Sequence, residues 1–273
     1  NLGEVTTHGY ELELRINKQI GKNWHVWGNF NMTHAVNKVK KKGDPALYPD
    51  YQKEAGYALG QYHSYINKGY VNTYDQIYGT TKHDVNDNQK LVGDYNIIDY
   101  NGDGVIDKDD AVPYGYSSTP QNTYNATIGF EWKGFSCFVQ FYGVNNVTRD
   151  VWLTDFGSNL DTVYDKGTWW NKNNTTPDVT PSRWDSTPSY NTATMYYYDG
   201  SYIRLKNAEI GYTFDNQWVH RLGVQNLKIY INGNNIWSWS RMPDDRESNF
   251  ASSGSTGAYP TMKRFNFGIK FTL

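Results

Sequence analysis

From Phe265 to its end, the chain alternates between apolar residues and residues that are polar or glycine. The apolar members of this segment share one face of an extended strand and are Phe265, Phe267, Ile269, Phe271 and Leu273. Successive side chains of a β-strand point to opposite faces, so this period of two predicts a strand over residues 263–273. A strand that is apolar to its final residue needs an apolar environment against one face. A closed barrel in lipid provides that environment, and so does a β-sandwich in water.

Six earlier segments show the same alternation. Together with the last one, the predicted strands cover residues 7–18, 24–39, 122–132, 135–143, 201–214, 226–239 and 263–273. In the fifth of these strands the apolar residues change face near residues 206–208, which predicts a β-bulge. The chain is therefore expected to be all-β and antiparallel, with about seven strands.

The connections between these strands alternate in length. Those after the first, third and fifth strands are short and cover residues 19–23, 133–134 and 215–225. Those after the second, fourth and sixth are long and cover residues 40–121, 144–200 and 240–262. Transmembrane barrels have short turns at the periplasmic rim and long loops at the extracellular rim, whereas a sandwich has no reason to separate loop lengths in this way. The pattern favours a transmembrane antiparallel β-barrel with long extracellular loops.

Composition excludes several other classes of protein. The net charge of −2 gives no indication of a nucleic-acid partner. The sequence has no run of about 18 apolar residues, which excludes a transmembrane helix but not a barrel. The single cysteine, Cys137, cannot form an internal disulfide. The 24 tyrosines and 10 tryptophans fit aromatic girdles at membrane interfaces and fit carbohydrate-binding surfaces equally well. No signal peptide precedes the first strand, so the chain is expected to be a fragment of a longer exported protein.

Several motifs resemble the late strands of SusC/RagA-type TonB-dependent outer-membrane transporters. They occur in the family's order along essentially the whole chain. The motifs are Gly3-Glu4-Val5, His8 to Glu11, Gly115 to Pro120, Ser201 to Asn207 with Gly211 to Thr213, Leu227 to Ile231, Gly233 to Trp237 and Tyr259-Pro260.

The resemblance implies a fold and a function. It implies the C-terminal third of a 22-stranded barrel, with this chain supplying strands 16 to 22 when its seven strands are counted from the end. It also implies import of oligosaccharides, or in some members peptides, across the bacterial outer membrane, with energy supplied through TonB. A SusD-like surface lipoprotein would cap the extracellular loops, and transporter–lipoprotein pairs would be able to form a dimer. The plug domain and the TonB-contacting region lie outside this chain.

An acidic loop in the first long connection resembles a calcium-binding loop. Residues 99–110 read D-Y-N-G-D-G-V-I-D-K-D-D, which is the ligand order of an EF-hand with Asp in place of the final Glu. The predicted ligands are Asp99, Asn101, Asp103, the Val105 carbonyl, Asp107 and Asp110. A structural Ca²⁺ would brace the loop. The alternative is an Asp/Asn/Gly-rich turn without an ion, since these residues dominate turns.

Three tryptophans are candidate contacts for a substrate or a partner. Trp169, Trp170 and Trp184 lie in the second long connection, where they would stack on sugar rings or anchor the loop to itself. Outside the acidic loop, no pair of carboxylates suggests glycosidase chemistry, so the chain is not expected to be an enzyme. The alternative function that remains is a soluble, calcium-stabilised β-sandwich that binds carbohydrate.

Overall fold

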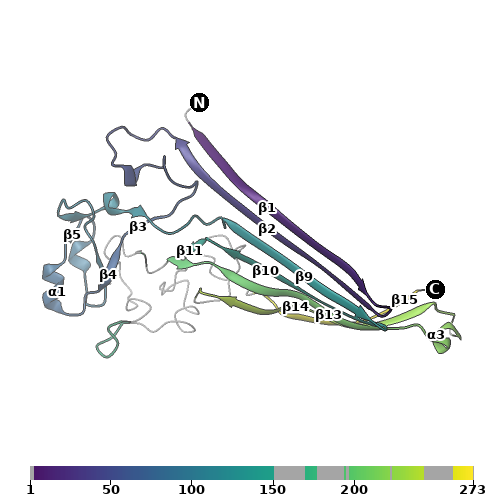
Figure 1. The fold of residues 1–273 in the computed structure, drawn as a ribbon. Helices are drawn as coiled ribbons and strands as arrows, with labels where there is room; N and C mark the ends of the chain where they lie inside the picture. The colour runs from purple at the N-terminus through teal and green to yellow at the C-terminus, as the bar shows by residue number, and fades with distance from the viewer. Residues whose placement is uncertain are drawn as a thin grey trace.

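The computed structural model describes residues 3–150, 170–176, 194, 197–221, 223–242 and 261–272. Seven long strands form one antiparallel sheet in which each strand pairs with its neighbours along the chain. The strands are β1 (Glu4–Ile20), β2 (Trp24–Lys41), β9 (Asn122–Trp132), β10 (Phe135–Asn145), β13 (Tyr202–Phe214), β14 (Asn226–Ser240) and β15 (Arg264–Thr272). Figure 1 shows them side by side as a single curved wall. The expected all-β barrel wall with about seven strands is confirmed.

The strands are longer than the alternation alone indicates. β1 begins at Glu4 and ends at Ile20, beyond the expected range 7–18, because its pairing with β2 continues along both strands as far as Lys41. The bulge expected in β13 is present. Leu205 pairs with Phe141 and Asn207 pairs with Gln140, which leaves Lys206 as the extra residue.

The short connections gather at one end of the sheet. The two residues joining β9 and β10 both have positive φ, +45° at Lys133 and +90° at Gly134, as a tight two-residue hairpin turn requires. The β13–β14 connection, expected as a plain turn, contains the helical turn α3 (Gln217–Arg221). Val219 of α3 is buried, and the Trp218 ring packs edge-on against Phe214. These contacts between apolar side chains explain why the segment forms a helical turn there.

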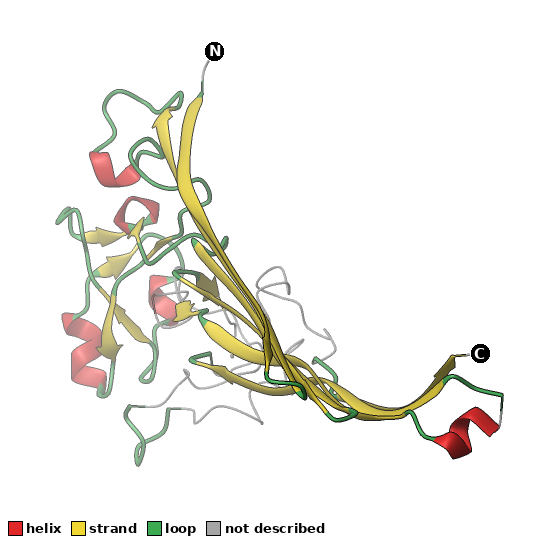
Figure 2. Cartoon of the chain, turned by 45° about the vertical axis from the view of Figure 1, so that its right-hand side comes forward, coloured by secondary structure: helices red, strands yellow, loops and turns green. Residues whose placement is uncertain are grey.

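The opposite end carries a folded lobe in place of an open loop. Between β2 and β9 the chain forms three 3-10 turns, one helix and six short strands. These elements are η1 (Asp50–Gln52), β3 (His63–Ser64), β4 (Asn67–Tyr70), α1 (Tyr74–Gly79), β5 (Lys82–His83), η2 (Asp87–Gln89), β6 (Tyr95–Ile97), β7 (Val105–Ile106), η3 (Lys108–Asp110) and β8 (Val112–Pro113). Figure 2 shows this lobe at the far end of the sheet from α3. A further short pair, β11 (Thr148–Asp150) with β12 (Tyr197–Asp199), follows β10.

The lobe has its own small core. Tyr95, Ile97 and Ile106 are buried together, and the half-buried rings of Tyr65 and Tyr70 pack against them. Because the sheet contributes none of these residues, the lobe is held by local contacts and by the β2 and β9 strands that carry it. Among the described residues, no helix is both long and apolar enough to cross a membrane.

Candidate functional site

One face of the sheet is apolar and uncovered. Register places the alternate apolar residues of neighbouring strands opposite one another, as in the row Ile210, Ile231 and Phe267. Phe267 leaves 66% of its surface exposed. The exposed apolar residues of this face, called the outer face below, include Leu12, Leu14, Ile16, Ile128, Phe130, Ile210, Ile231, Phe265, Phe267, Ile269 and Phe271. In the described part of the chain no second sheet packs on them, which argues against a β-sandwich and for an apolar solvent.

Aromatic rings gather on the outer face beside the short turns. Trp24 stacks on Trp132 with ring centroids 5.5 Å apart, and Trp132 lies 6.4 Å from Phe135 across the hairpin. Phe135 in turn meets Tyr212 edge-on at 4.8 Å. Amphipathic rings concentrate where hydrocarbon meets water. This band therefore marks one interface of the membrane.

The opposite face, called the inner face below, carries a ladder of side-chain amides. Gln140 Nε2 donates to Asn125 Oδ1 at 3.1 Å, and Asn207 Nδ2 donates to Gln140 Oε1 at 2.5 Å. Asn234 Nδ2 donates in turn to Asn207 Oδ1. The ladder crosses β9, β10, β13 and β14 with every amide donating in the same direction. An uncharged, hydrogen-bonding surface of this kind suits a polar lumen.

Charged residues flank the ladder in pairs. On the short-turn side, Lys228 Nζ lies 2.8 Å from Glu209 Oε1, and His25 bridges Asn17 and Glu131. The alternation in the sequence predicts polar residues at these positions but does not predict the ladder. Which amides meet depends on the register between strands, and the alternation within one strand carries no information about register.

The acidic loop is folded by its own backbone amides. Asp99 accepts hydrogen bonds from the N–H groups of Gly102 at 2.7 Å and Gly104 at 2.8 Å. Both glycines have positive φ, +76° and +89°, which lets the chain turn around the Asp99 carboxylate. Asp103 accepts from the N–H of Val105, and Asp107 accepts from that of Asp109.

Asp110 closes the acidic loop from inside the lobe. Its carboxylate is 0% exposed and accepts N–H groups from Tyr100 at 2.6 Å, Asn101 at 3.3 Å and Asp107 at 2.9 Å. Ile106, on the strand within the loop, is buried in the lobe core. The order of oxygen-bearing residues fits a hard cation such as Ca²⁺. Within the described residues, however, no three His, Cys, Asp or Glu side chains converge as a ready-made metal site.

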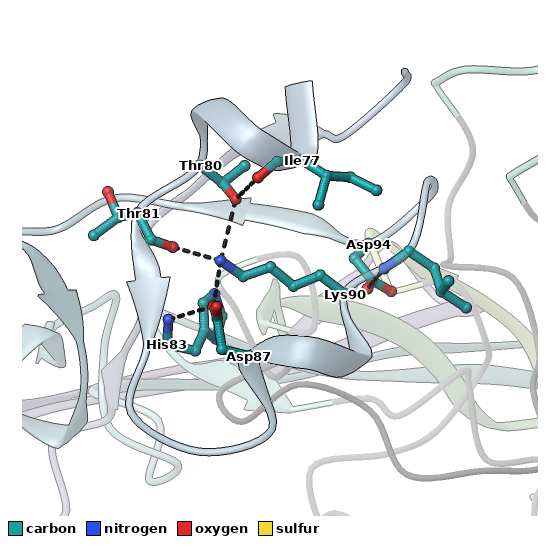
Figure 3. Close-up of polar contacts among 8 residues, drawn as sticks. Ile77, Thr80, Thr81, His83, Asp87, Lys90 and Asp94 are labelled. Carbon is teal, nitrogen blue, oxygen red and sulfur yellow. Dashed lines mark hydrogen bonds and ion pairs between the residues drawn. The ribbon is translucent and has the colours of Figure 1, made fainter. Parts of the chain in front are cut away.

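A half-buried lysine, Lys90, holds the neighbouring turn of the lobe (Figure 3). Lys90 Nζ donates to the carbonyl of Thr81 at 2.6 Å and to Thr80 Oγ1 at 3.1 Å, and it lies 2.6 Å from Asp87 Oδ1. Asp87 also accepts the N–H of His83 at 2.8 Å. Burial raises the pKa of Asp87, but the hydrogen bonds from Lys90 and His83 outweigh burial and hold that pKa below its ordinary value. The network joins α1, β5 and η2.

Of the three candidate tryptophans, one lies within the described residues. Trp170 Nε1 donates to Asn72 Oδ1 at 2.8 Å, so this ring anchors its segment to the lobe. Trp169 and Trp184 lie outside the described residues, as does Leu273 at the end of the last strand.

Comparison with known proteins gives the architecture a context. No protein-family model matches the chain. The chain is 25% identical to TonB-dependent receptor P3 of Formosa agariphila over 98% of its length, and 28% identical to TonB-dependent receptor P26 of the same bacterium over 67%. It spans 29% of the first relative and 20% of the second.

Solved structures of the RagAB peptide transporter share the fold. One superposes over 99% of the chain with a TM-score of 0.69 at 18% identity, and the closed-closed state of the RagAB peptide importer gives 0.67 at 17%. The matches cover 29% and 30% of those chains. The chain therefore has the fold of one section of a RagAB-type barrel and is similar in sequence to TonB-dependent receptors. Its place is the bacterial outer membrane, and the outer face described above is the lipid-facing side of the barrel wall. The relatives are named as receptors and transporters, which agrees with the expectation that the chain is not an enzyme.

A charge placed on the outer face should destabilise the barrel. Phe267→Lys puts an ammonium group against hydrocarbon near the middle of β15, and we expect a loss of about 2–4 kcal/mol of folding free energy in lipid. Asn266→Lys, one residue away on the inner face, is the matched control and should cost less than about 1 kcal/mol. Denaturant titration of the full-length protein in lipid vesicles, read by heat-modifiable gel mobility, measures both. Equal losses for the two variants would contradict the assignment of faces.

Removal of the Lys90 ammonium should loosen the lobe alone. Lys90→Met removes the ammonium from the Asp87 carboxylate and the Thr81 carbonyl, at an expected cost of about 1–2 kcal/mol, because the Asp87 side chain is 37% exposed and keeps the His83 N–H. Hydrogen exchange of residues 80–97 should accelerate while that of the strands stays unchanged. Because the pKa of Asp87 is lowered in the folded lobe, the ion pair stabilises the wild type above the unfolded carboxyl pKa, and this stabilisation disappears as pH falls through the folded pKa. The variant should show a weaker acid dependence, because only the hydrogen bond from the His83 N–H still lowers the pKa of Asp87. An identical acid dependence in both proteins would contradict the assignment.

Proposed function

We propose that this chain forms part of the wall of an outer-membrane importer for neutral, hydrogen-bonding oligomers, either oligosaccharides or short peptides. The observation that carries the proposal is the division of one continuous sheet into an apolar outer face and an amide-lined inner face. A lipid-facing wall needs the first, and a lumen that passes polar cargo needs the second. Further support comes from the fold shared with RagAB, a peptide importer, and from the relatedness to TonB-dependent receptors.

The proposed importer works with two protein partners. Energy from the inner membrane would reach the full-length protein through TonB, as the names of the relatives suggest for them. A SusD-like lipoprotein would sit on the lobe between β2 and β9, which stands on the long-loop side of the wall. Paired transporter–lipoprotein units would then allow a dimer. The short-turn end, with α3, would face the periplasm.

An uptake experiment tests the function and separates the two cargo classes. A strain that lacks the full-length protein should lose uptake of one labelled pool, oligosaccharide or peptide, and keep uptake of the other. Loss of TonB should have the same effect as loss of the protein. Native mass spectrometry of the purified protein after exposure to each pool would identify what is bound. Unchanged uptake of both pools in the deletion strain would remove the proposal.

We also propose that the acidic loop takes up a structural Ca²⁺, with Asp99, Asn101, Asp103, the Val105 carbonyl, Asp107 and Asp110 as ligands. The support is the order of oxygen donors around Gly104 and the burial of Ile106, which ties the loop to the lobe core. A hard ion held by several carboxylates would relieve their mutual repulsion. Its role would be to stiffen the lobe and not to switch it.

Calcium should stabilise the lobe by an amount that rises with the logarithm of its concentration once the site is saturated. At about one hundred times its dissociation constant, an ion that binds only the folded lobe contributes about 2.7 kcal/mol. Asp103→Ala should abolish this gain. Asp109→Ala is the matched control, because the hydrogen bonds described for Asp109 use its backbone and its side chain is not a proposed ligand. Thermal unfolding with and without chelator gives the answer. A wild-type lobe indifferent to Ca²⁺ would mean that backbone amides alone satisfy the carboxylates.

A further inference from the structure

A pocket of about 350 Å³ opens where β9, β10, β13 and β14 reach the long-loop end of the sheet. Its walls include Tyr124, Asn145, Ile203, Trp239 and Arg241. This volume lies in the lower part of the range for small-ligand sites, about 300–1,000 Å³. The pocket shares no lining residue with the amide ladder or with the acidic loop, so neither of these features explains its presence.

Register places the lower wall of the pocket on the lipid-facing side. Tyr124 pairs with Gly143, Gly143 with Ile203, and Ile203 with Trp239, so these four positions form one row on the outer face. Gly143 leaves a gap in the row, and Ile203 leans over it so closely that a Cβ at Gly143 would lie 3.0 Å from Ile203 Cγ1. The row is apolar and aromatic, like the rows below it.

The next positions of the same strands, on the same face, are polar. Asn145 accepts a hydrogen bond from Asn122 Nδ2 at 2.5 Å, and Arg241 lies two residues beyond Trp239. Arg241 pairs with Asp199 at 3.1 Å, while Ser201 donates to the other oxygen of Asp199 through its N–H at 3.0 Å and its hydroxyl at 2.5 Å. The outer face therefore changes from apolar to polar within the pocket itself.

The chemistry of the pocket indicates its ligand. Asp199 neutralises Arg241, so the site carries no net positive charge and is not built for a polyphosphate. The Arg241 guanidinium lies 5.8 Å from the centre of the Trp239 ring, and one of its nitrogens binds Asp199. A flat ring beside amide, hydroxyl and guanidinium groups suits a sugar, which stacks through its C–H face and hydrogen-bonds through its hydroxyls.

We propose that this pocket binds the sugar headgroup of an outer-leaflet glycolipid, with the acyl chains lying along Ile203 and the apolar rows below. The proposal rests on the proposed orientation of the wall, with the long-loop end extracellular. It gives the outer face a specific lipid contact in addition to its general affinity for hydrocarbon. The same chemistry would also recognise a free oligosaccharide, and the experiment separates the two sources.

Native mass spectrometry of the delipidated full-length protein in neutral detergent tests the proposal. The probes are a dephosphorylated rough lipopolysaccharide, which presents sugar and not phosphate, a diacyl phospholipid without sugar, and the free oligosaccharide released from that lipopolysaccharide. Trp239→Ala should weaken binding of the lipopolysaccharide by about tenfold, on the scale of one lost aromatic contact. Trp218→Ala is the matched control, because Trp218 is similarly exposed, 47% against 49% for Trp239, but lies in α3 at the short-turn end of the sheet, outside the pocket and the rows proposed to hold the acyl chains. It should change binding less than twofold.

Each of the following results would overturn the proposal. Equal losses for the two variants, or no loss for either, would mean that the lipid contact is unspecific. Phospholipid binding with the same sensitivity to Trp239→Ala would exclude sugar recognition, and free oligosaccharide binding as tightly as the lipopolysaccharide would exclude a lipid ligand. Heat-modifiable gel mobility confirms that both variants fold. Because uptake of cargo is measured separately, failure of the lipid site leaves the importer proposal standing. Unchanged cargo uptake in the deletion strain would remove the importer proposal but leave the lipid site standing.

Discussion

The structure depends on the uncovered apolar face of one sheet. Within the sheet each interior strand satisfies its backbone N–H and C=O groups with two neighbours, so the wall is internally complete in the hydrogen-bonding direction. The outer face is not complete, because residues such as Ile16 and Phe267 leave most of their surface exposed. In water such a surface would drive aggregation, whereas in a bilayer it is the condition for insertion. The length of the strands, the aromatic band beside the short turns and the polar inner face are all features that a wall spanning a lipid bilayer requires.

The strands were predictable from sequence because they obey a period of two, and the lobe was not because it obeys no single period. The alternation of Leu12, Leu14 and Ile16 gives both the strand and its lipid-facing side. The lobe is held instead by individual side chains, such as Ile106, which is buried in its core, and the half-buried Lys90, which donates to the Thr81 carbonyl. These contacts join residues within a short stretch of chain, such as Lys90 and Thr81 nine positions apart, but they follow neither the period of a strand nor that of a helix, so the sequence pattern does not report them. The helical turn α3 was not predictable from sequence for a similar reason, since it depends on the burial of Val219.

Candidate sites divide along the same line. The acidic loop was visible in sequence because all its ligand positions lie within twelve residues. Its geometry adds that backbone amides already occupy the carboxylates of Asp99 and Asp110, so any ion would add to an arrangement that the loop holds by itself. The amide ladder and the pocket at the long-loop end of the sheet each take residues from four strands. Which of these residues lie next to one another depends on the register between strands, which the sequence does not show. The candidate metal loop, which lies within one segment, was therefore predictable from sequence, whereas the ladder and the pocket, which cross several strands, were not.

Register at the long-loop end depends on one extra residue. Below Lys206, the even-numbered residues of β13, such as Ala208 and Ile210, face lipid; above it, the odd-numbered residues Ile203 and Leu205 do. Without the bulge, a one-residue shift would turn Arg204, which is buried beside the Tyr202 ring, toward hydrocarbon. It would also remove Ile203 from the row that it shares with Trp239. The inward placement of Arg204 and the position of Ile203 in the outer-face pocket are thus two consequences of the same bulge. One extra residue in β13 therefore determines the side chains on both faces of the wall at its long-loop end.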